Sequence, residues 1–294
     1  MLLFGRSFRH ISILGMALLM VGCTSQPTTV VDARATVRVV PALSACIDAI
    51  AADGSLHGPQ LDADAIRVVN WNIQKGDHPD WTDDLDAIHG EADILILQEA
   101  SPDFEAWNQL APMHHRSFAQ GFRGFGHNTG VMTLSAAAPV AECDLVEHEP
   151  WLRTPKAMLV TEYGLAGADT TLLVINIHGV NFSLGMRELR RQMAAAERII
   201  AAHEGPVLFS GDFNTWRGAR TNLINEILSD LGLEALEYDA DYRKRILGWP
   251  LDHIYVRGLD TVSATTYEFD SSDHNPMLVE FRLVPDARVW VARQ

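Results

Sequence analysis

Short apolar runs alternate with longer amphipathic stretches from about residue 66 onward. Residues 94–97 form an uninterrupted apolar run, which is typical of a buried strand. Residues 184–203 instead repeat Leu189, Met193 and Ile200 near 3.6-residue spacing, which predicts an amphipathic helix. Further apolar runs predict strands at 66–71, 131–134, 157–161, 172–177, 206–210, 254–256, 262–269 and 277–283.

Two more helices are predicted from their first turns. Residues 81–90 carry Asp83 and Asp84 near the start, where acidic side chains favour a helix. Residues 221–231 follow the same periodic pattern, with Thr221 as the expected N-cap. Strands and helices therefore alternate, but the last third is dense in strands. This order predicts an α/β fold with mixed sheets rather than one parallel sheet.

A polar residue directly follows or precedes most of these strands. Such positions gather at one rim of a sheet and are held rigidly by it. Each residue alone is as typical of a turn or a helix cap as of a functional site. Together they predict one site, built from Asn72, Glu99, His178, Asp212, Asn214, Asp252, Asp273 and His274.

The residue types at these positions favour one kind of chemistry. Carboxylates and a carboxamide are hard oxygen ligands, suited to Mg²⁺ or Mn²⁺ rather than to zinc. The chain has no H-E-x-x-H zinc motif and no G-x-S-x-G nucleophile elbow. The glycines of residues 121–126 do not follow the order of a dinucleotide or phosphate loop, so this segment, with Arg123, is interpreted as a flexible surface loop.

The N-terminus has the pattern of an export signal. Arg6 and Arg9 precede an apolar run at 11–21, which is too short to span a membrane. The run ends at Cys23, with a polar segment after it, and this resembles a bacterial lipoprotein signal in which the cysteine is lipidated. An ordinary signal peptide and an uncleaved anchor are the alternatives. We expect an exported protein, anchored by lipid to a bacterial membrane and facing the periplasm or the exterior.

The domain plan follows from these segments. Residues 1–22 are interpreted as the signal, 23–36 as a tether, 37–65 as an N-terminal arm and 66–294 as one catalytic-type domain. Two cysteines remain beyond the lipid site, Cys46 and Cys143. An exported protein can keep a disulfide between them, and two free buried thiols are the alternative.

Six short segments carry a resemblance to a known family. WNIQ (71–74), LQE (97–99), NIH (176–178), GDFN (211–214), LDHIYV (251–256) and SDHNP (272–276) are similar, in order, to the motifs of the endonuclease/exonuclease/phosphatase superfamily. Longer stretches such as GVMTLSAAAPV (130–140) and NIHGVNFSLG (176–185) resemble its bacterial YafD-type branch. The resemblance covers about residues 66–283.

The resemblance implies a DNase I-like fold, a four-layer sandwich of two mixed β-sheets flanked by helices. It also implies a role for each core residue. Glu99 holds the metal with Asn72, and Asp273 completes that site or holds a second ion. His274 acts as the general base or as the imidazole that faces the phosphate, oriented by Asp252. Asp212 and Asn214 position the attacking water and the phosphate, while His178 donates to a non-bridging oxygen. Gln74 departs from members that carry an acidic residue there, which leaves the number of metals open.

Substrate contacts are predicted at three further positions. Asn181 would assist His178, Arg243 in a basic cluster would grip a second phosphate or a headgroup, and Trp216 would form an aromatic wall. For Arg243 a solvated loop and for Trp216 packing beneath the loop are the alternatives. The substrate is a nucleic acid, a phospholipid headgroup or a small phosphorylated metabolite.

The charge of the chain bears on that choice. The formal net charge is -15, which counts against a dedicated binder of duplex DNA. We therefore expect a monomeric, metal-dependent phosphodiesterase or phosphatase. The competing hypothesis is a binding lipoprotein on an inactive scaffold of the same fold, which predicts the loss of one or more core residues.

Overall fold

Two β-sheets lie face to face at the centre of the computed structural model, which describes residues 41–50, 59–90, 92–181, 183 and 185–284. The seven strands of the first sheet, called sheet I, run in the order β1 (Leu61–Asp62), β7 (Pro155–Ala166), β8 (Thr171–His178), β9 (Val207–Asp212), β13 (Asp252–Arg257) and β10 (Glu234–Ala235), with β6 (Ala141–His148) also paired to β7. The pairs β1/β7 and β8/β9 are parallel and the others antiparallel, so sheet I is mixed.

The second sheet, called sheet II, has six strands and is also mixed. Its order is β14 (Leu259–Thr266), β15 (Met277–Leu283), β2 (Ile66–Asn72), β3 (Ile94–Ala100), β5 (His127–Ser135) and β4 (His115–Gly124), and only β2 and β3 are parallel neighbours. A separate two-stranded ribbon is formed by β11 (Arg245–Ile246) and β12 (Trp249–Pro250).

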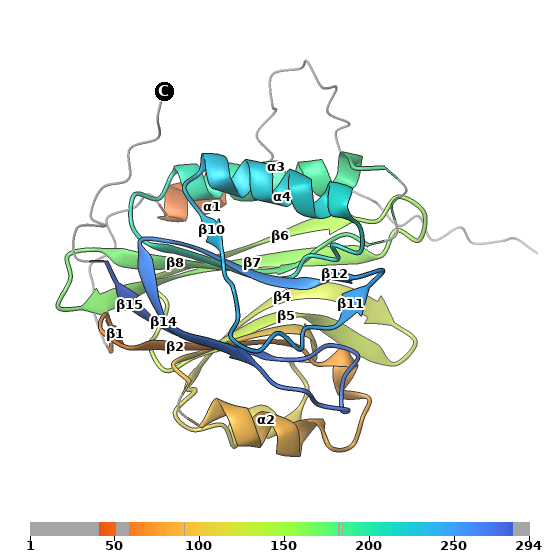
Figure 1. Cartoon of the computed structure of the whole chain (residues 1–294), viewed down its shortest axis with the longest axis horizontal. Coiled ribbons are helices and arrows are strands. Elements are labelled where there is room, and N and C mark those ends of the chain that lie inside the picture. Colours follow the sequence, from red (N-terminus) through yellow and green to blue (C-terminus); the bar gives the residue numbers. More distant parts are fainter. Residues whose placement is uncertain (1–40, 51–58, 91, 182, 184, 285–294) are drawn as a thin grey trace, which may run out of the picture. The chain divides into compact units, whose positions relative to one another are not determined.

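Helices cover the outer face of each sheet (Figure 1). Sheet I is covered by α1 (Pro41–Ile50), α3 (Arg187–Ala201) and α4 (Gly218–Asp230), whose apolar side chains join one core cluster with β7, β8 and β9. Sheet II is covered by α2 (Trp81–His89) and the 3₁₀ helix η2 (Glu105–Asn108). A third core cluster fills the space between the sheets. This confirms the predicted four-layer sandwich.

Several element boundaries differ from the prediction. The helix expected at 184–203 is α3, which begins at Arg187. Thr221 does not cap α4 but lies inside it, because the helix starts at Gly218 with Arg217 in extended backbone as its N-cap. The last predicted strand before β15 is β14, which starts at Leu259.

Two of the longer strands were missed because their patterns are only half apolar. Every residue of β6 is at least partly exposed, so the strand shows no apolar run. The strand β4 includes the first part of the segment interpreted as a surface loop. Residues 121–124 belong to β4, and only Phe125 and Gly126 form the turn to β5. The interpretation of 121–126 as a surface loop was therefore wrong for most of its length.

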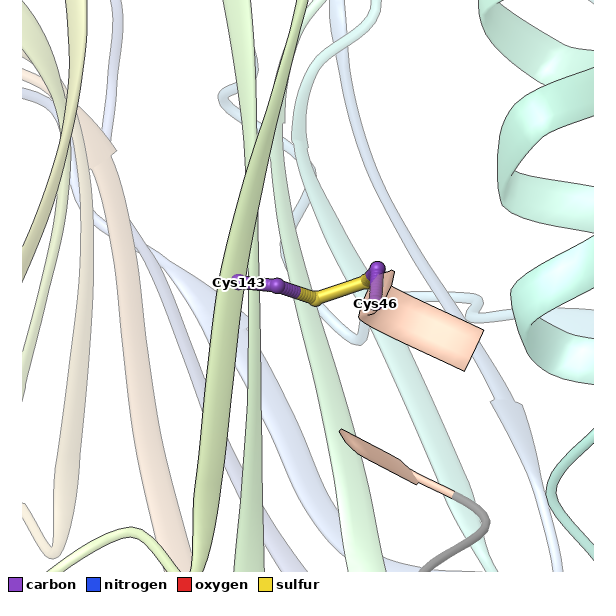
Figure 2. The surroundings of a disulfide bond; sticks show 2 residues. All are labelled: Cys46 and Cys143. Carbon is purple, nitrogen blue, oxygen red and sulfur yellow. A yellow bond between two sulfur atoms is a disulfide. The ribbon is translucent and has the colours of Figure 1, made fainter. Parts of the chain in front are cut away.

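The N-terminal arm contributes a helix to the domain. Leu43, Cys46 and Ile50 on one side of α1 are buried in the cluster beneath α3 and α4. A disulfide joins Cys46 to Cys143 of β6 (Figure 2), which decides between the two alternatives left open for these cysteines. The predicted signal, tether and lipid site at Cys23 lie outside the described residues. Within the described part of the chain, no helix is long and apolar enough to cross a membrane.

The disulfide is expected to stabilise the fold by constraining the unfolded chain. Cys46 and Cys143 are 97 residues apart, and closing a loop of that length contributes up to about 4–5 kcal/mol to the free energy of unfolding. Adding a phosphine reductant should therefore lower the melting temperature, as measured by circular dichroism. The matched control is the double variant Cys46→Ala/Cys143→Ala, whose melting temperature should be lower and insensitive to reductant. A wild-type melting temperature that does not respond to reductant would contradict this account.

Candidate functional site

Three predicted residues form a row across the rim of sheet I. His178 ends β8 and Asp212 ends β9, and these two strands are parallel with His178 beside Asp212. Asp252 begins the antiparallel strand β13 and lies directly opposite Asp212. Strand pairing therefore places the three side chains on neighbouring positions, although they are far apart in the sequence.

Sheet II contributes Asn72 and Glu99 to the same site. Asn72 ends β2 next to Gln98 of β3. In a regular strand Glu99 would point to the opposite face from Gln98. Instead the register shifts between Gln98 and Ala100, and Glu99 has a φ of 55°, which turns its carboxylate toward the site. Its Oε1 lies 3.9 Å from Nε2 of His178.

His274 is held in place from both sides. Its Nδ1 lies 2.7 Å from Oδ2 of Asp252, and both side chains are buried. The Nε1–H of Trp71 donates to the carbonyl oxygen of His274 at 3.0 Å. Ser272 donates from Oγ to the carbonyl oxygen of Asn72 and accepts the backbone N–H of His274. The loop before β15 is thereby fixed to the end of β2.

Asp212 is the centre of the hydrogen-bond network. Its Oδ2 accepts from Nδ2 of Asn72 at 3.1 Å and its Oδ1 accepts the backbone N–H of Asn214 at 2.8 Å. Nε2 of His178 and Nε2 of His274 lie 3.5 Å and 3.7 Å from the same Oδ2. One buried carboxylate thus contacts four of the other predicted core residues.

The charges of these groups are strongly perturbed. Burial alone lowers the pKa of His274, but the carboxylates of Asp252 and Asp212 outweigh it and raise that pKa to about 10. Burial raises the pKa of Asp212 to about 6, and the nearby His274 opposes this shift. Burial and the neighbouring Lys156 hold the pKa of His178 well below its usual value, so His178 is neutral. The residues themselves therefore favour a cationic His274 at neutral pH.

Two lysines that sequence reasoning missed line the site. Nζ of Lys75 lies 2.7 Å from Oε2 of Glu99, and Nζ of Lys156 lies 2.5 Å from Nε2 of His178. Lys75 follows the first motif directly, and Lys156 immediately precedes a predicted strand. Both positions follow the same rule of polar residues next to strands, but lysine is not among the hard metal ligands or the acid–base residue types that predicted the site.

The donors present fit a hard divalent cation. Glu99 and Asp273 offer carboxylate oxygens and Asn72 a carboxamide oxygen, as Mg²⁺ or Mn²⁺ prefers. The Asp273 side chain is 63 % exposed and still accessible to an ion. Asp212, Asp252 and His274 form a second group whose potential ligand atoms lie within 4.8 Å of one another. In that group Nδ1 of His274 is bonded to Asp252, which leaves Nε2, and in the first group Oε2 of Glu99 is paired with Lys75 and Oδ1 of Asn72 accepts the backbone N–H of Gln74.

A buried polar network lies directly beneath the site and joins the two sheets. Nε2 of Gln98 donates to the side-chain oxygens of Asn70 and Asn176, at 3.1 Å and 2.8 Å. Asn176 of sheet I donates to the carbonyl oxygens of Leu97 and Met132 of sheet II, and Ser210 donates to Asn70. Asn70, Asn176 and Ser210 each precede a core residue by two positions. Residues two positions apart in a strand point to the same face, so this spacing was a signal in the sequence for the buried network.

A buried arginine braces the Asn214 loop. Asn214 has a φ of 53°, in the left-handed region that costs energy for a non-glycine residue. The guanidinium of the fully buried Arg220 donates to the carbonyl oxygens of Asn214 and Val180. Nδ2 of Asn214 in turn donates to the carbonyl oxygen of Gly179 at 3.0 Å. These bonds hold the loops after β8 and β9 together.

The three predicted substrate contacts have different surroundings. Arg243 donates to Asp241 and to the carbonyl oxygen of Asp252, so its charge supports the loop before β13. Trp216 packs against the guanidinium groups of Arg217 and Arg220, at 5.0 Å and 5.6 Å. Asn181 is half-buried, and its backbone N–H donates to Glu149. Their roles toward a substrate stay predictions.

Gln74, the residue that departs from the family pattern, has a structural contact. Its Oε1 accepts the backbone N–H of Asp273 at 3.1 Å. Gln74 therefore ties the 3₁₀ turn η1 (Gln74–Gly76) to the loop that carries Asp273 and His274.

The chain belongs to the endonuclease/exonuclease/phosphatase family, whose model matches residues 69–274. A UPF0294 protein of Vibrio campbellii is 38 % identical over 226 residues, covering 76 % of this chain and 80 % of the relative. A UPF0294 protein of Yersinia pseudotuberculosis is 40 % identical over 229 residues, covering 77 % and 87 %. These relatives confirm the predicted YafD-type branch.

Solved structures confirm the fold. The catalytic domain of human Nocturnin with a bound sulfate anion aligns with a TM-score of 0.60 at 16 % identity, covering 77 % of this chain and 97 % of that one. ANGEL2, described as a 2′,3′-cyclic phosphatase, aligns with a TM-score of 0.58 at 14 % identity, covering 76 % and 96 %. Family membership makes the chain a hydrolase of phosphoric esters, and enzymes of this family generally use divalent metals.

The pairing of His274 with two carboxylates predicts a measurable charge state. In metal-free protein the His274 ring should stay protonated well above pH 7 and lose its proton near pH 10. Asp252→Asn removes one of the three carboxylate charges that raise the pKa of His274, while burial still lowers it, so His274 should titrate at lower pH. NMR titration of the ring in the presence of EDTA measures both values. A wild-type pKa near the ordinary value of about 6.5 would contradict the assignment.

Proposed function

We propose that this chain is a divalent-metal-dependent hydrolase in which water attacks the phosphorus of a phosphodiester. The observation that carries the proposal is the convergence on Asp212 of two histidines, an asparagine from sheet II and the Asn214 loop. Glu99, Asn72 and Asp273 are the residues that would hold the cation. A divalent ion there supplies charge neutralisation on phosphate oxygens and a lowered pKa for a bound water.

The protein residues then divide the remaining work. We propose that Asp212 takes the proton from the attacking water, because its pKa near 6 leaves it ionised and weakly basic at neutral pH. His274, held cationic by Asp252, stabilises negative charge that develops on the phosphate. Of the two roles expected for His274, general base or phosphate-facing imidazole, this proposal assigns the second, and Asp212 takes the role of the base. The three groups are close enough to titrate as one unit, so an apparent pKa belongs to the cluster.

The surroundings of the site favour a lipid headgroup as the substrate. The turns from β4 to β5 and from β6 to β7 expose Phe125, Trp151 and Leu152, with 96 %, 69 % and 64 % of their surface accessible. The same two hairpins contribute Phe122 and Pro155 to a cavity beside Glu99. Exposed apolar tips next to a site are typical of contact with a membrane or a partner.

The location of the protein is part of the same proposal. We propose that the chain is exported and anchored by lipid at Cys23, which places the site close to a membrane surface. The net charge of -15 counts against a nucleic-acid substrate. A small phosphorylated metabolite is the remaining alternative, and an inactive binding lipoprotein is the alternative from another class. The presence and mutual contacts of the core residues count against the inactive form.

Substituting Glu99 or His274, or removing the metal ion, should remove most of the hydrolytic activity. We expect Glu99→Gln and His274→Ala each to lower kcat/KM for bis(p-nitrophenyl) phosphate by about 10²–10³-fold, as for loss of one group that stabilises developing charge. EDTA should remove the activity, and Mg²⁺ or Mn²⁺ should restore it. The matched control is Asp260→Asn, which changes an exposed carboxylate on β14. Full activity of either site variant with an intact fold would refute the mechanism, and an inactive wild type would support the binding scaffold.

The apolar turns should matter only when the substrate lies in a bilayer. We expect Phe125→Ser/Trp151→Ser, in a chain starting at residue 24, to lose most of its activity on phospholipid vesicles. Its activity on the soluble aryl diester should stay unchanged, because both side chains are exposed and outside the core. Single- and double-stranded DNA, RNA and small monoesters complete the panel. Preferred hydrolysis of one of these, with no activity on vesicles, would exclude the headgroup substrate.

A further inference from the structure

A cavity of about 220 Å³ opens beside the site. One wall comes from the hairpin of β4 and β5 and the other from the start of β7. Four charged or polar side chains of the site border it, and the rest of its lining is mainly apolar or backbone. The four are Lys75, Glu99, Lys156 and His178. The cavity is therefore continuous with the candidate site at the edge of the two sheets.

The hydrogen bond between Lys156 and His178 has a defined direction. An ammonium group only donates, so Nε2 of His178, 2.5 Å from Nζ, is the acceptor. The ring proton then resides on Nδ1. His178 consequently has no Nε2–H to offer to a phosphate oxygen, which was the role that the family resemblance implied.

Lys156 has donors left over. An ammonium has three N–H groups, and within the described part of the chain its hydrogen-bond partner is the single nitrogen of His178. No carboxylate of the described residues lies within 4.0 Å of Nζ. Burial lowers the pKa of Lys156, and Asp212, Glu149 and Glu99, which act on it from farther away, do not outweigh that effect. A half-buried cation without a directly paired anion carries a desolvation cost that a bound anion would offset.

We infer that Lys156 binds a non-bridging oxygen of the substrate phosphate, and that His178 is a positioning residue that aims its ammonium group. The phosphate lies at the mouth of the cavity, between Lys156 and Asp212. The group esterified to it extends along the apolar walls formed by Phe122 and Ala157. This inference rests on the proposed function for its substrate, but the anion site itself does not require turnover.

A purely structural lysine makes a different prediction. If Lys156 only balanced the charge of Asp212 and Glu149, its loss would reduce stability and leave anion affinity unchanged. If it binds phosphate, its loss weakens anion binding, and arginine restores part of it because arginine keeps the charge and offers donors. Equilibrium binding of inorganic phosphate separates the two roles.

The test compares wild-type protein with Lys156→Met and Lys156→Arg by isothermal titration calorimetry with inorganic phosphate. We expect Lys156→Met to weaken phosphate binding by about 10- to 100-fold, the usual consequence of losing a hydrogen bond to a charged group. Lys156→Arg should recover part of the affinity. The control Arg190→Met removes one positive charge from an exposed position on α3 and should bind phosphate as the wild type does. Unchanged affinity in folded Lys156→Met would overturn the inference.

A second variant keeps the test decisive if Lys156→Met does not fold. His178→Asn should weaken phosphate binding in the wild-type background, because the ammonium group loses its acceptor. In the Lys156→Arg background the same substitution should have a smaller effect, since the guanidinium is not aimed by that bond. Equal effects in both backgrounds would overturn the positioning role. A wild type that binds phosphate through Lys156 but hydrolyses no ester would refute the proposed function and leave this inference standing.

Discussion

The hydrogen-bonded contact between the two sheets beneath the site is the constraint on which the rest of the structure depends. Gln98, Asn70 and Asn176 are fully buried, and an unpaired amide at such a position costs about 1–3 kcal/mol. Asn176 and Ser210 of sheet I bond to Gln98, Met132 and Asn70 of sheet II, and these bonds fix the two sheets in one register. Asn72, His178 and Asp212 lie further along the same strands. The register of the two sheets therefore also fixes the positions of these site residues. The apolar cluster elsewhere between the sheets contributes contacts that are less directional.

The site is also an arrangement of opposed charges. Two buried carboxylates keep His274 cationic, and two lysines stand beside Glu99 and His178. A chain with a net charge of -15 thus places three cations, Lys75, Lys156 and His274, among the carboxylates of the site where a phosphate would lie. These local charges act on a bound anion in addition to the field of the whole chain.

Apolar runs and strand-end polar residues predicted an α/β fold with mixed sheets and the residues of the site, and the family resemblance implied the four layers. Features that depend on pairing between distant strands were missed. The bulge that turns Glu99 is produced by its partner β5, and the role of Cys143 depends on where α1 packs. Lys156 was missed because its importance comes from a neighbour 22 positions away, His178. Asn70, Asn176 and Ser210 each lie two positions before a site residue. This spacing is visible in the sequence, but the three residues were interpreted only as parts of the predicted strands.

The central claim is that the rim shared by the two sheets holds the catalytic cation. The most direct test is anomalous diffraction from crystals of the protein soaked with Mn²⁺. The account predicts a manganese peak in contact with the Glu99 carboxylate and next to Asn72. An absence of manganese at the rim under conditions that support hydrolysis, or a peak only at a distant surface site, would contradict it.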